Sequence, residues 1–273
     1  MNGEIAILGA GVMGGSLARA LSQQGRSIRI WTPNFSDAAQ AGTLPGVTLA
    51  PDAATAMRDV DGVVFATPLG AIPDLLDDVM VGAPAGAWLQ DLASLQSPPL
   101  RAVVHAGLAD RYVSAHPMVG SHKSGFAGSQ DDLYRDAPVW LSEAGVDPGI
   151  RAAAVRFWSI LGSQPHWIDA DEHDDRMIWV SHLPQMVSVA LANTLSSGGR
   201  AADELGPGGR DMTRLAASNP GMWRDLFEEA GPRLSETLRQ MATRLIETAE
   251  HMDAADLDAI VAEFEEAGRW RGE

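Results

Sequence analysis

The sequence predicts an α/β domain with a parallel sheet followed by an all-α domain, and three observations support this fold class. Over the first part of the chain, short apolar runs alternate with helical stretches, which is the pattern of βαβ units. A glycine-rich turn stands directly after the first of these runs. From residue 169 onward no strand pattern appears and long helical segments follow. The 273 residues therefore divide into two predicted domains, residues 1–168 and residues 169–273.

The elements of the first domain are short and are bounded by turn residues. Apolar runs of four or five residues are typical of strands in a buried parallel sheet, and the stretches between them carry helical spacing. Strands are predicted at Glu4–Leu8, Ser27–Trp31, Gly62–Ala66, Ala87–Asp91, Tyr112–Ala115 and Pro138–Leu141. Helices are predicted at Ser16–Gln23, Asp52–Arg58, Ile72–Val79 and Pro148–Leu161.

The second domain is predicted to be helical throughout. Asp171–Ser196 forms a long apolar helix that Pro184 interrupts, and a glycine-rich loop follows at Gly198–Gly209. Further helices are predicted at Pro220–Phe227, Arg233–Ala249 and Ala255–Ala267. About 100 residues arranged in this way are too elongated to bury all their apolar faces alone. The pattern therefore predicts a homodimer formed through these helices.

Composition and charge exclude several classes of function. The chain carries 36 acidic and 20 basic side chains, a formal charge of −16, which repels nucleic acids and anionic membrane surfaces. It has no cysteine, so disulfides, zinc–thiolate sites and cysteine nucleophiles are excluded. No apolar run reaches the ~18 residues of a membrane span, and the N-terminus lacks a signal-peptide pattern. We expect a soluble cytoplasmic protein whose partner is a small anionic molecule rather than nucleic acid or membrane.

The residues Gly9, Gly11, Val12, Met13 and Gly14 belong to a G-x-G-x-x-G motif between a strand and a helix. Glycines at this spacing allow a tight turn, close approach of a pyrophosphate and packing of helix on strand, and the helix N-terminus attracts the phosphates. This context favours a Rossmann-type dinucleotide-binding domain over a purely structural glycine turn.

The tip of the second strand bears on the choice between NAD and NADP. Thr32 stands where NAD-binding domains usually carry an acidic residue for the ribose, and the next carboxylate is Asp37. NADP is therefore slightly favoured, although no arginine stands at the tip to bind a 2′-phosphate. Thr67 and Pro68 follow the third predicted strand and are placed to line the cofactor, but an ordinary strand-ending turn explains them equally well.

Polar residues after two later strands are candidates for catalysis. His116 lies beyond a strand's carboxyl end, where open α/β sheets bind ligands, and imidazole suits a general base near neutral pH. Ser94 follows another strand end and could bond to His116, but a helix N-cap before Pro98 is the better interpretation from the residues alone. The acidic run at residues 171–175 is better explained as a solvated helix start than as a metal site, so no metal is expected.

The second domain contains two further polar segments. His182 and Gln185 lie in the segment Ser-His-Leu-Pro-Gln of the apolar helix. Arg214, near the glycine-rich loop, is a candidate for binding a substrate carboxylate, and Trp223 lies nine residues beyond it. A local ion pair is the alternative explanation for such an arginine.

Taken together, these segments resemble the prephenate/arogenate dehydrogenase family of tyrosine biosynthesis. The order of motifs is the same over nearly the whole chain, and His-Pro-Met-x-Gly-Ser combined with Ser-His-Leu-Pro is quite specific. The resemblance implies NAD(P)-dependent oxidative decarboxylation of a cyclohexadienyl substrate. It implies that His116 takes the proton of the ring hydroxyl and that Ser94 orients His116. It further implies that Arg214 binds a substrate carboxylate, while Ser121, His182 and Trp223 line the substrate pocket.

One departure from the family pattern bears on the substrate. Many prephenate-using members carry histidine where this chain has Gln185. If that histidine contacts the pyruvyl side chain of prephenate, its loss favours arogenate, and the reaction forms tyrosine. Oxidation of prephenate to 4-hydroxyphenylpyruvate, or use of both substrates, remains an alternative because glutamine both donates and accepts hydrogen bonds.

Two other functions compete with this interpretation. A β-hydroxyacid or imine-reducing dehydrogenase also joins a dinucleotide-binding domain to a helical dimerisation domain, but it usually employs a lysine on the interdomain helix. The lysine of this chain, Lys123, lies instead in the His-Pro-Met loop. A non-catalytic dinucleotide sensor would keep the glycine motif but would have no reason to retain Ser94, His116 and Arg214 together.

Overall fold

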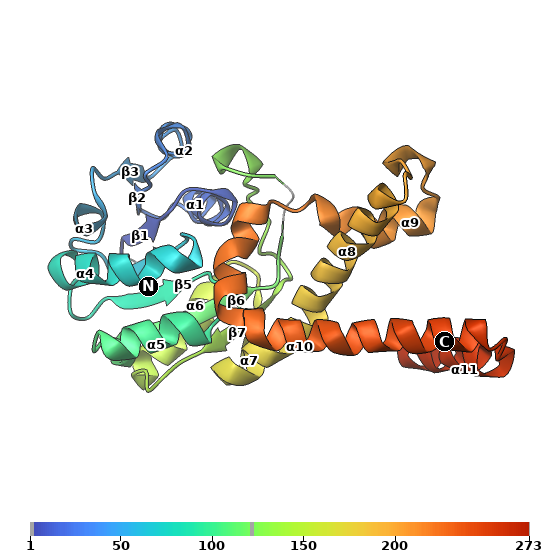
Figure 1. The fold of residues 1–273 in the computed structure, drawn as a ribbon. Coiled ribbons are helices and arrows are strands. Elements are labelled where there is room, and N and C mark those ends of the chain that lie inside the picture. Colours follow the sequence, from blue (N-terminus) through green and yellow to red (C-terminus); the bar gives the residue numbers. More distant parts are fainter. Residues whose placement is uncertain (1–2, 121–122, 273) are drawn as a thin grey trace. The chain divides into compact units, whose positions relative to one another are not determined.

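The computed structural model describes residues 3–120 and 123–272 and confirms an α/β part followed by helices (Figure 1). The chain forms two compact units, which are described separately here. The first comprises Met1–Met177 and Ala217–Glu229, and the second comprises Ile178–Ala216 and Ala230–Glu273. The helical segment up to Met177 therefore belongs to the first unit, although the sequence places it in the second predicted domain.

Within the described residues, the first unit contains one eight-stranded sheet in the order β3-β2-β1-β4-β5-β6-β7-β8. Strands β1 to β6 run parallel to one another. Because the chain crosses from β3 back to β4 beside β1, the carboxyl ends of β1 and β4 flank the point where the strand order reverses. Open α/β sheets bind their ligands at that point. The strands are β1 (Ile5–Leu8), β2 (Ile28–Trp31), β3 (Val47–Leu49), β4 (Gly62–Phe65), β5 (Trp88–Asp91), β6 (Tyr112–Pro117), β7 (Pro138–Ser142) and β8 (Gln164–Trp167).

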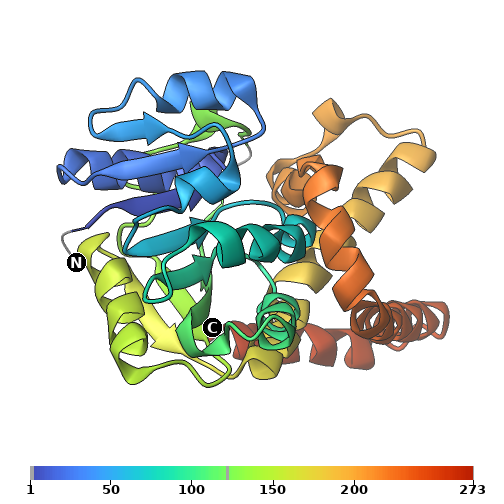
Figure 2. The same cartoon turned by 90° about the vertical axis from the view of Figure 1, so that its left-hand side faces the viewer.

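Helices cover both faces of this sheet (Figure 2). Alternate residues of β1 enter different cores: Ile5 and Ile7 pack on one face, and Ala6 and Leu8 on the other. Helices α1 and α6 bury side chains in the first core, while α3, α4 and α5 bury theirs in the second. The helices of this unit are α1 (Val12–Gln23), α2 (Phe35–Ala41), α3 (Ala53–Ala56), α4 (Ile72–Gly82), α5 (Ser97–His105), α6 (Pro148–Ile160) and α7 (Ala170–Met177).

The last two strands depart from the predicted all-parallel sheet. Strand β7 pairs antiparallel with β6, and β8 pairs parallel with β7. The connection from β6 to β7 contains only the short 3-10 turn Phe126–Gly128 among its described residues. A parallel neighbour requires a crossover, usually a helix, so this connection returns the chain as an antiparallel strand.

The second unit is helical, as predicted. It contains α8 (Leu183–Ser197), α9 (Pro207–Thr213), the C-terminal part of α10 (Pro220–Asp253) and α11 (Leu257–Arg271). Gln185 of α8 donates to the Leu215 carbonyl at 2.7 Å, and Thr248 of α10 donates to Glu263 of α11 at 2.8 Å. No helix among the described residues is long and apolar enough to cross a lipid bilayer.

Prolines act differently from the sequence prediction in this helical region. The expected break between Phe227 and Arg233 is absent, because α10 continues through Pro232. Pro184 does not interrupt a helix but lies in the first turn of α8, where its missing N–H costs little. The preceding five residues, Ile178–His182, form a π-helical turn that separates α7 from α8.

Candidate functional site

The glycine turn after β1 has the geometry that a dinucleotide requires. Gly9 adopts φ 101°, and a Cβ there would lie 2.4 Å from the Ala66 carbonyl oxygen. A Cβ on Gly14 would lie 2.0 Å from the Gly9 carbonyl oxygen, so this position is closed by packing. A Cβ on Gly11 would instead meet open space. The turn is therefore tight at both ends and open in the middle, where a pyrophosphate would approach the backbone.

Helix α1 starts four residues earlier than predicted, directly at this turn. Gly11 is its N-cap residue, Val12 begins the helix, and no side chain caps the free amides. The Met13 carbonyl accepts from the Tyr134 hydroxyl at 2.8 Å, which ties the first turn of α1 to the segment before β7. The uncapped N-terminus of α1 can thus receive a phosphate group.

The other predicted cofactor residues lie at the ends of β2 and β4. The buried Oγ1 of Thr67 has no hydrogen-bond partner among the described residues, as expected of a group that awaits a ligand, and Pro68 beside it is exposed. Thr32 at the tip of β2 accepts a weak bond from the Asn34 amide at 3.4 Å. Asp37 is buried and accepts from the Phe126 amide at 2.8 Å, so it does not supply the missing acidic residue at the tip.

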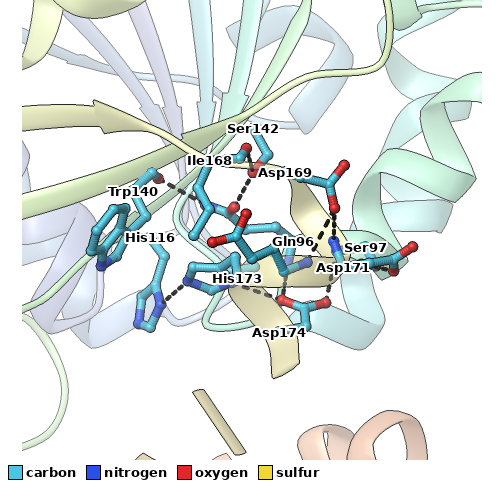
Figure 3. Close-up of polar contacts among 12 residues, drawn as sticks. Gln96, Ser97, His116, Trp140, Ser142, Ile168, Asp169, Asp171, His173 and Asp174 are labelled. Carbon is cyan, nitrogen blue, oxygen red and sulfur yellow. Dashed lines mark hydrogen bonds and ion pairs between the residues drawn. The ribbon is translucent and has the colours of Figure 1, made fainter. Parts of the chain in front are cut away.

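His116 is the next-to-last residue of β6 and lies at the same edge of the sheet as the glycine turn. Its Nδ1 is 3.0 Å from Nε2 of His173, and the two rings meet edge to face (Figure 3). His173 lies on α7 and is fully buried, and its Nδ1 is 2.8 Å from Oδ1 of Asp174. The side chains of β6 and α7 therefore form a continuous hydrogen-bonded chain from His116 to a carboxylate.

Asp174 is held by the first amides of α5. Its Oδ1 accepts from the Gln96 amide at 2.8 Å and its Oδ2 from the Ser97 amide at 2.9 Å (Figure 3). Burial raises the pKa of Asp174, but the hydrogen bonds from His173, Gln96 and Ser97 outweigh it and hold that pKa below its usual value. Asp174 is therefore ionised at neutral pH and caps α5 from a distant part of the chain.

The prediction that residues 171–175 form a solvated helix start is wrong for two of the five. His173 and Asp174 face the sheet and are buried, because α7 is short and one side of it packs against α5 and β6. Asp171 and Glu172 lie in the first turn, as the pattern predicts. Among the described residues, no group of three or more His, Asp or Glu side chains is arranged to hold a metal ion.

The environment of Ser94 differs from the one that the sequence predicts. Ser94 is exposed, it makes no hydrogen bond among the described residues, and His173 is the residue that contacts Nδ1 of His116. The N-cap interpretation of Ser94 is wrong, because α5 begins at Ser97 and Asp174 caps it. The orienting role that the family resemblance gives Ser94 stays a prediction.

A second carboxyl group is buried near the end of β5. Asp91 accepts from the Ala93 amide at 2.7 Å and from the Tyr112 hydroxyl at 2.9 Å. Complete burial raises the pKa of Asp91 to about 7 although these hydrogen bonds oppose the rise. No sequence pattern singled out this residue, since an aspartate at a strand end is usually a turn residue.

The remaining predicted substrate residues are distributed over both units. His182 and Gln185 are buried in the second unit, and the exposed Arg214 follows α9 in that unit with no ion pair among the described residues. Trp223 belongs to the first unit, where its ring stacks on Phe227. Ser121 lies outside the described residues.

Sequence reasoning missed His173 and Asp174. The His-Asp pair was visible in an acidic run, but its burial was not, because its partners come from β6 and the start of α5. The available signal was the position of this histidine, which stands among acidic residues about one helical turn before an apolar stretch.

Comparisons with known proteins identify a family for both parts of the chain. The model of the prephenate dehydrogenase nucleotide-binding domain matches residues 17–164, and that of the prephenate dehydrogenase dimerization domain matches residues 169–266. Cyclohexadienyl dehydrogenase of Zymomonas mobilis is 26% identical, with 98% of this chain and 94% of that protein covered. Prephenate dehydrogenase of Bacillus subtilis is 25% identical, with 99% of this chain and 76% of that protein covered.

Solved structures show the same fold. The crystal structure of Aquifex aeolicus prephenate dehydrogenase, in complex with hydroxyphenyl propionate and NAD+, superposes with a TM-score of 0.90 at 26% identity and covers 98% of this chain and 96% of that one. Synechocystis arogenate dehydrogenase has a TM-score of 0.82 at 22% identity over 98% of both chains, a likeness of fold alone. Because the two family models together span most of the chain, it belongs to the prephenate dehydrogenase family of oxidoreductases.

Proposed function

We propose that the protein oxidatively decarboxylates a cyclohexadienyl acid with a nicotinamide dinucleotide, and that arogenate is its preferred substrate. The observation that carries the proposal is the position of His116 at the same edge of the sheet as the glycine turn. A base and a dinucleotide site on one edge are the two components that oxidation of an alcohol requires. The Aquifex relative, which binds NAD+ together with a hydroxyphenyl compound, supports this assignment.

The residues of the glycine turn fit the cofactor. Gly9, Gly11 and Gly14, with the free amides at Val12 and Met13, would hold the pyrophosphate, and the hydroxyl of Thr67 would meet the cofactor with its unused hydrogen-bonding capacity. When bound, the nicotinamide accepts the two electrons of the oxidation. The weak preference for NADP rests on the tip of β2, where Thr32 stands in place of an acidic residue, and on Asp37 of α2, which already accepts a bond from the Phe126 amide.

His116 would act on the ring hydroxyl of the substrate. As C4 of the ring gives up its hydrogen with the bonding electron pair, the hydroxyl proton passes to His116, so no unstable cationic carbonyl forms. The C1 carboxylate then leaves as carbon dioxide, its bonding electrons complete the aromatic ring, and the phenolate oxygen regains the proton from His116. A positioned base typically contributes about 10²–10⁴-fold to such a step.

The second unit would supply groups that bind the substrate. Arg214 offers a guanidinium that is not engaged in an ion pair among the described residues, and a protein of charge −16 needs such a local cation to bind a dicarboxylate. On the strength of the family resemblance, His182, Ser121 and Trp223 are also proposed to bind the substrate. The dimerisation-domain match supports a homodimer formed through the helical unit.

Gln185 supports arogenate over prephenate. Its Nε2 donates to the Leu215 carbonyl, which holds the side chain against the residue after Arg214. An uncharged amide at this position does not provide the cationic donor that histidine would offer to the pyruvyl group of prephenate. Use of both substrates is the second candidate, because an amide can bond to either side chain.

The test is an assay of purified protein in four pairings of substrate and cofactor. Arogenate or prephenate is combined with NAD or NADP, and the reduced cofactor is followed by its absorbance. We expect turnover with arogenate and a modest preference for NADP. A tenfold or greater preference for prephenate contradicts the substrate assignment, and cofactor binding without any turnover indicates a dinucleotide sensor instead.

A further inference from the structure

The hydrogen-bonded chain behind His116 has a fixed direction. It starts at the Asp174 carboxylate, which receives two backbone amides at the first turn of α5 and is held ionised by its hydrogen bonds. An ionised carboxylate only accepts hydrogen bonds, so Nδ1 of His173, 2.8 Å away, must donate. In the neutral ring the lone pair of His173 then lies on Nε2.

The donor and acceptor roles at His173 in turn determine those at His116. Nε2 of His173 accepts from Nδ1 of His116 at 3.0 Å, so Nδ1 of His116 carries the hydrogen and its lone pair lies on Nε2. The opposite neutral tautomer of His173 would set a lone pair against the carboxylate in a fully buried site, which is costly without water. Through Asp174 and His173, the backbone amides at the start of α5 therefore determine that Nε2 is the basic nitrogen of His116.

We propose that His173 and Asp174 are positioning residues that fix the tautomer and ring orientation of His116, so that its Nε2 is the atom that takes the substrate proton. This inference rests on the proposed function, since it names what makes His116 an effective base. When His116 takes up a proton, the positive charge faces a chain that ends in a carboxylate, and the bond to His173 strengthens. The substrate-facing nitrogen is thus set by residues that do not touch the substrate.

Two substitutions of His173 separate positioning from packing. His173→Leu removes both hydrogen bonds, whereas His173→Gln keeps one donor for Asp174 and one acceptor for His116. We expect kcat to fall by about 100-fold or more in His173→Leu, with KM and the Kd of the cofactor close to those of the wild type. His173→Gln should recover at least about tenfold of that loss.

Asp174→Asn tests the carboxylate itself. Asparagine can keep the bond from the Ser97 amide with its oxygen, but its N–H₂ group then takes the place of Oδ1. There it faces His173 and the Gln96 amide, so it reverses the direction of the chain and removes the acceptor of that amide. We expect a loss of kcat similar to that of His173→Leu. The matched control is Asp171→Asn, because Asp171 also bonds to the start of α5, through the Ser97 hydroxyl at 2.8 Å, and does not contact either histidine.

The tautomer is measured directly, independently of turnover. In protein labelled with ¹⁵N at its histidine rings, with His116 assigned through a His116→Asn variant, we expect the hydrogen of neutral His116 on Nδ1. The hydrogen should shift toward Nε2 in His173→Leu and remain on Nδ1 in His173→Gln. The proposal is overturned if the hydrogen of neutral His116 lies on Nε2 in the wild type, or if both His173 variants have the kcat of the wild type. It is also overturned if Asp171→Asn lowers kcat as much as Asp174→Asn does. If the protein turns over no cyclohexadienyl substrate, the proposed function fails while the tautomer result still stands alone.

Discussion

At the scale of single residues, the three motif glycines have separable roles. Gly11 faces open space, so we expect Gly11→Ala to fold with only a small loss of stability and to bind the dinucleotide about tenfold or more weakly, because the methyl group occupies the approach of the pyrophosphate. Calorimetric titration with NAD and NADP and a thermal melt measure the two effects. Gly86→Ala, also in open space but outside the turn, is the control. Unchanged cofactor binding in Gly11→Ala would contradict the assigned cofactor site.

Gln185 gives a prediction about specificity. We expect Gln185→His to raise kcat/KM for prephenate relative to arogenate by about tenfold, the effect of one hydrogen-bonding group that suits one substrate better. Steady-state kinetics with both substrates measures the ratio. Gln185→Asn, which keeps the amide but shortens it, controls for loss of the bond to the Leu215 carbonyl. A ratio equal in the His and Asn variants would show that residue 185 does not discriminate between the side chains.

Residues could be predicted from sequence where a local motif defines their role. The motif glycines lie in a tight turn between β1 and α1, because their spacing determines the local backbone path. The site formed by His173 and Asp174 could not be predicted, because its partners come from β6 and the start of α5, 57 and 78 residues earlier in the chain. Tertiary packing buries part of a helix start that is polar in sequence, and a local sequence pattern does not reveal such packing.

At the scale of elements, α11 carries an exposed apolar stripe. Leu257, Val261 and Phe264 follow one another at helical spacing, and they are 69%, 54% and 77% exposed. We expect these side chains to be covered in the proposed homodimer, so that Phe264→Asp weakens self-association by at least about tenfold. Sedimentation velocity over a range of concentrations measures it. Phe35→Asp is the matched control, an 88% exposed phenylalanine in the first unit, and an equal effect of both variants would contradict a dimer through α11.

Strongly apolar elements were predicted, and polar or short ones were missed. Strands β1 and β4 are buried throughout and stand out in the sequence as apolar runs. Strand β3 lies at the edge of the sheet with mostly exposed residues, and helix α2 is polar, so neither shows a clear period. The sequence predicts separate helices at Pro220–Phe227 and Arg233–Ala249, but α10 runs unbroken from Pro220 to Asp253 with Pro232 inside it.

At the scale of the whole molecule, two buried carboxyl groups with opposite pKa shifts give stability a defined pH dependence. The lowered pKa of Asp174 stabilises the fold above the unfolded value near 4, and this contribution is lost as pH falls through the folded pKa. The pKa of Asp91 is raised to about 7, so the folded state keeps a proton that the unfolded state has released. Stability therefore falls as pH rises from about 4 to about 7 and stays lower above that.

Asp91→Asn should remove the second effect. Asparagine carries no charge at any pH, and the Tyr112 hydroxyl can rotate to accept from its amide, so burial remains satisfied. Each unit of pKa shift changes the free energy of unfolding by about 1.4 kcal/mol. The difference in the free energy of unfolding between wild type and variant should therefore drop by a few kcal/mol between pH 4.5 and pH 8. Urea unfolding at intervals across this range measures the difference, in which the contributions of Asp174 and the histidines cancel. A difference that does not change with pH would mean that Asp91 is ionised in the folded protein throughout, and that its hydrogen bonds outweigh its burial.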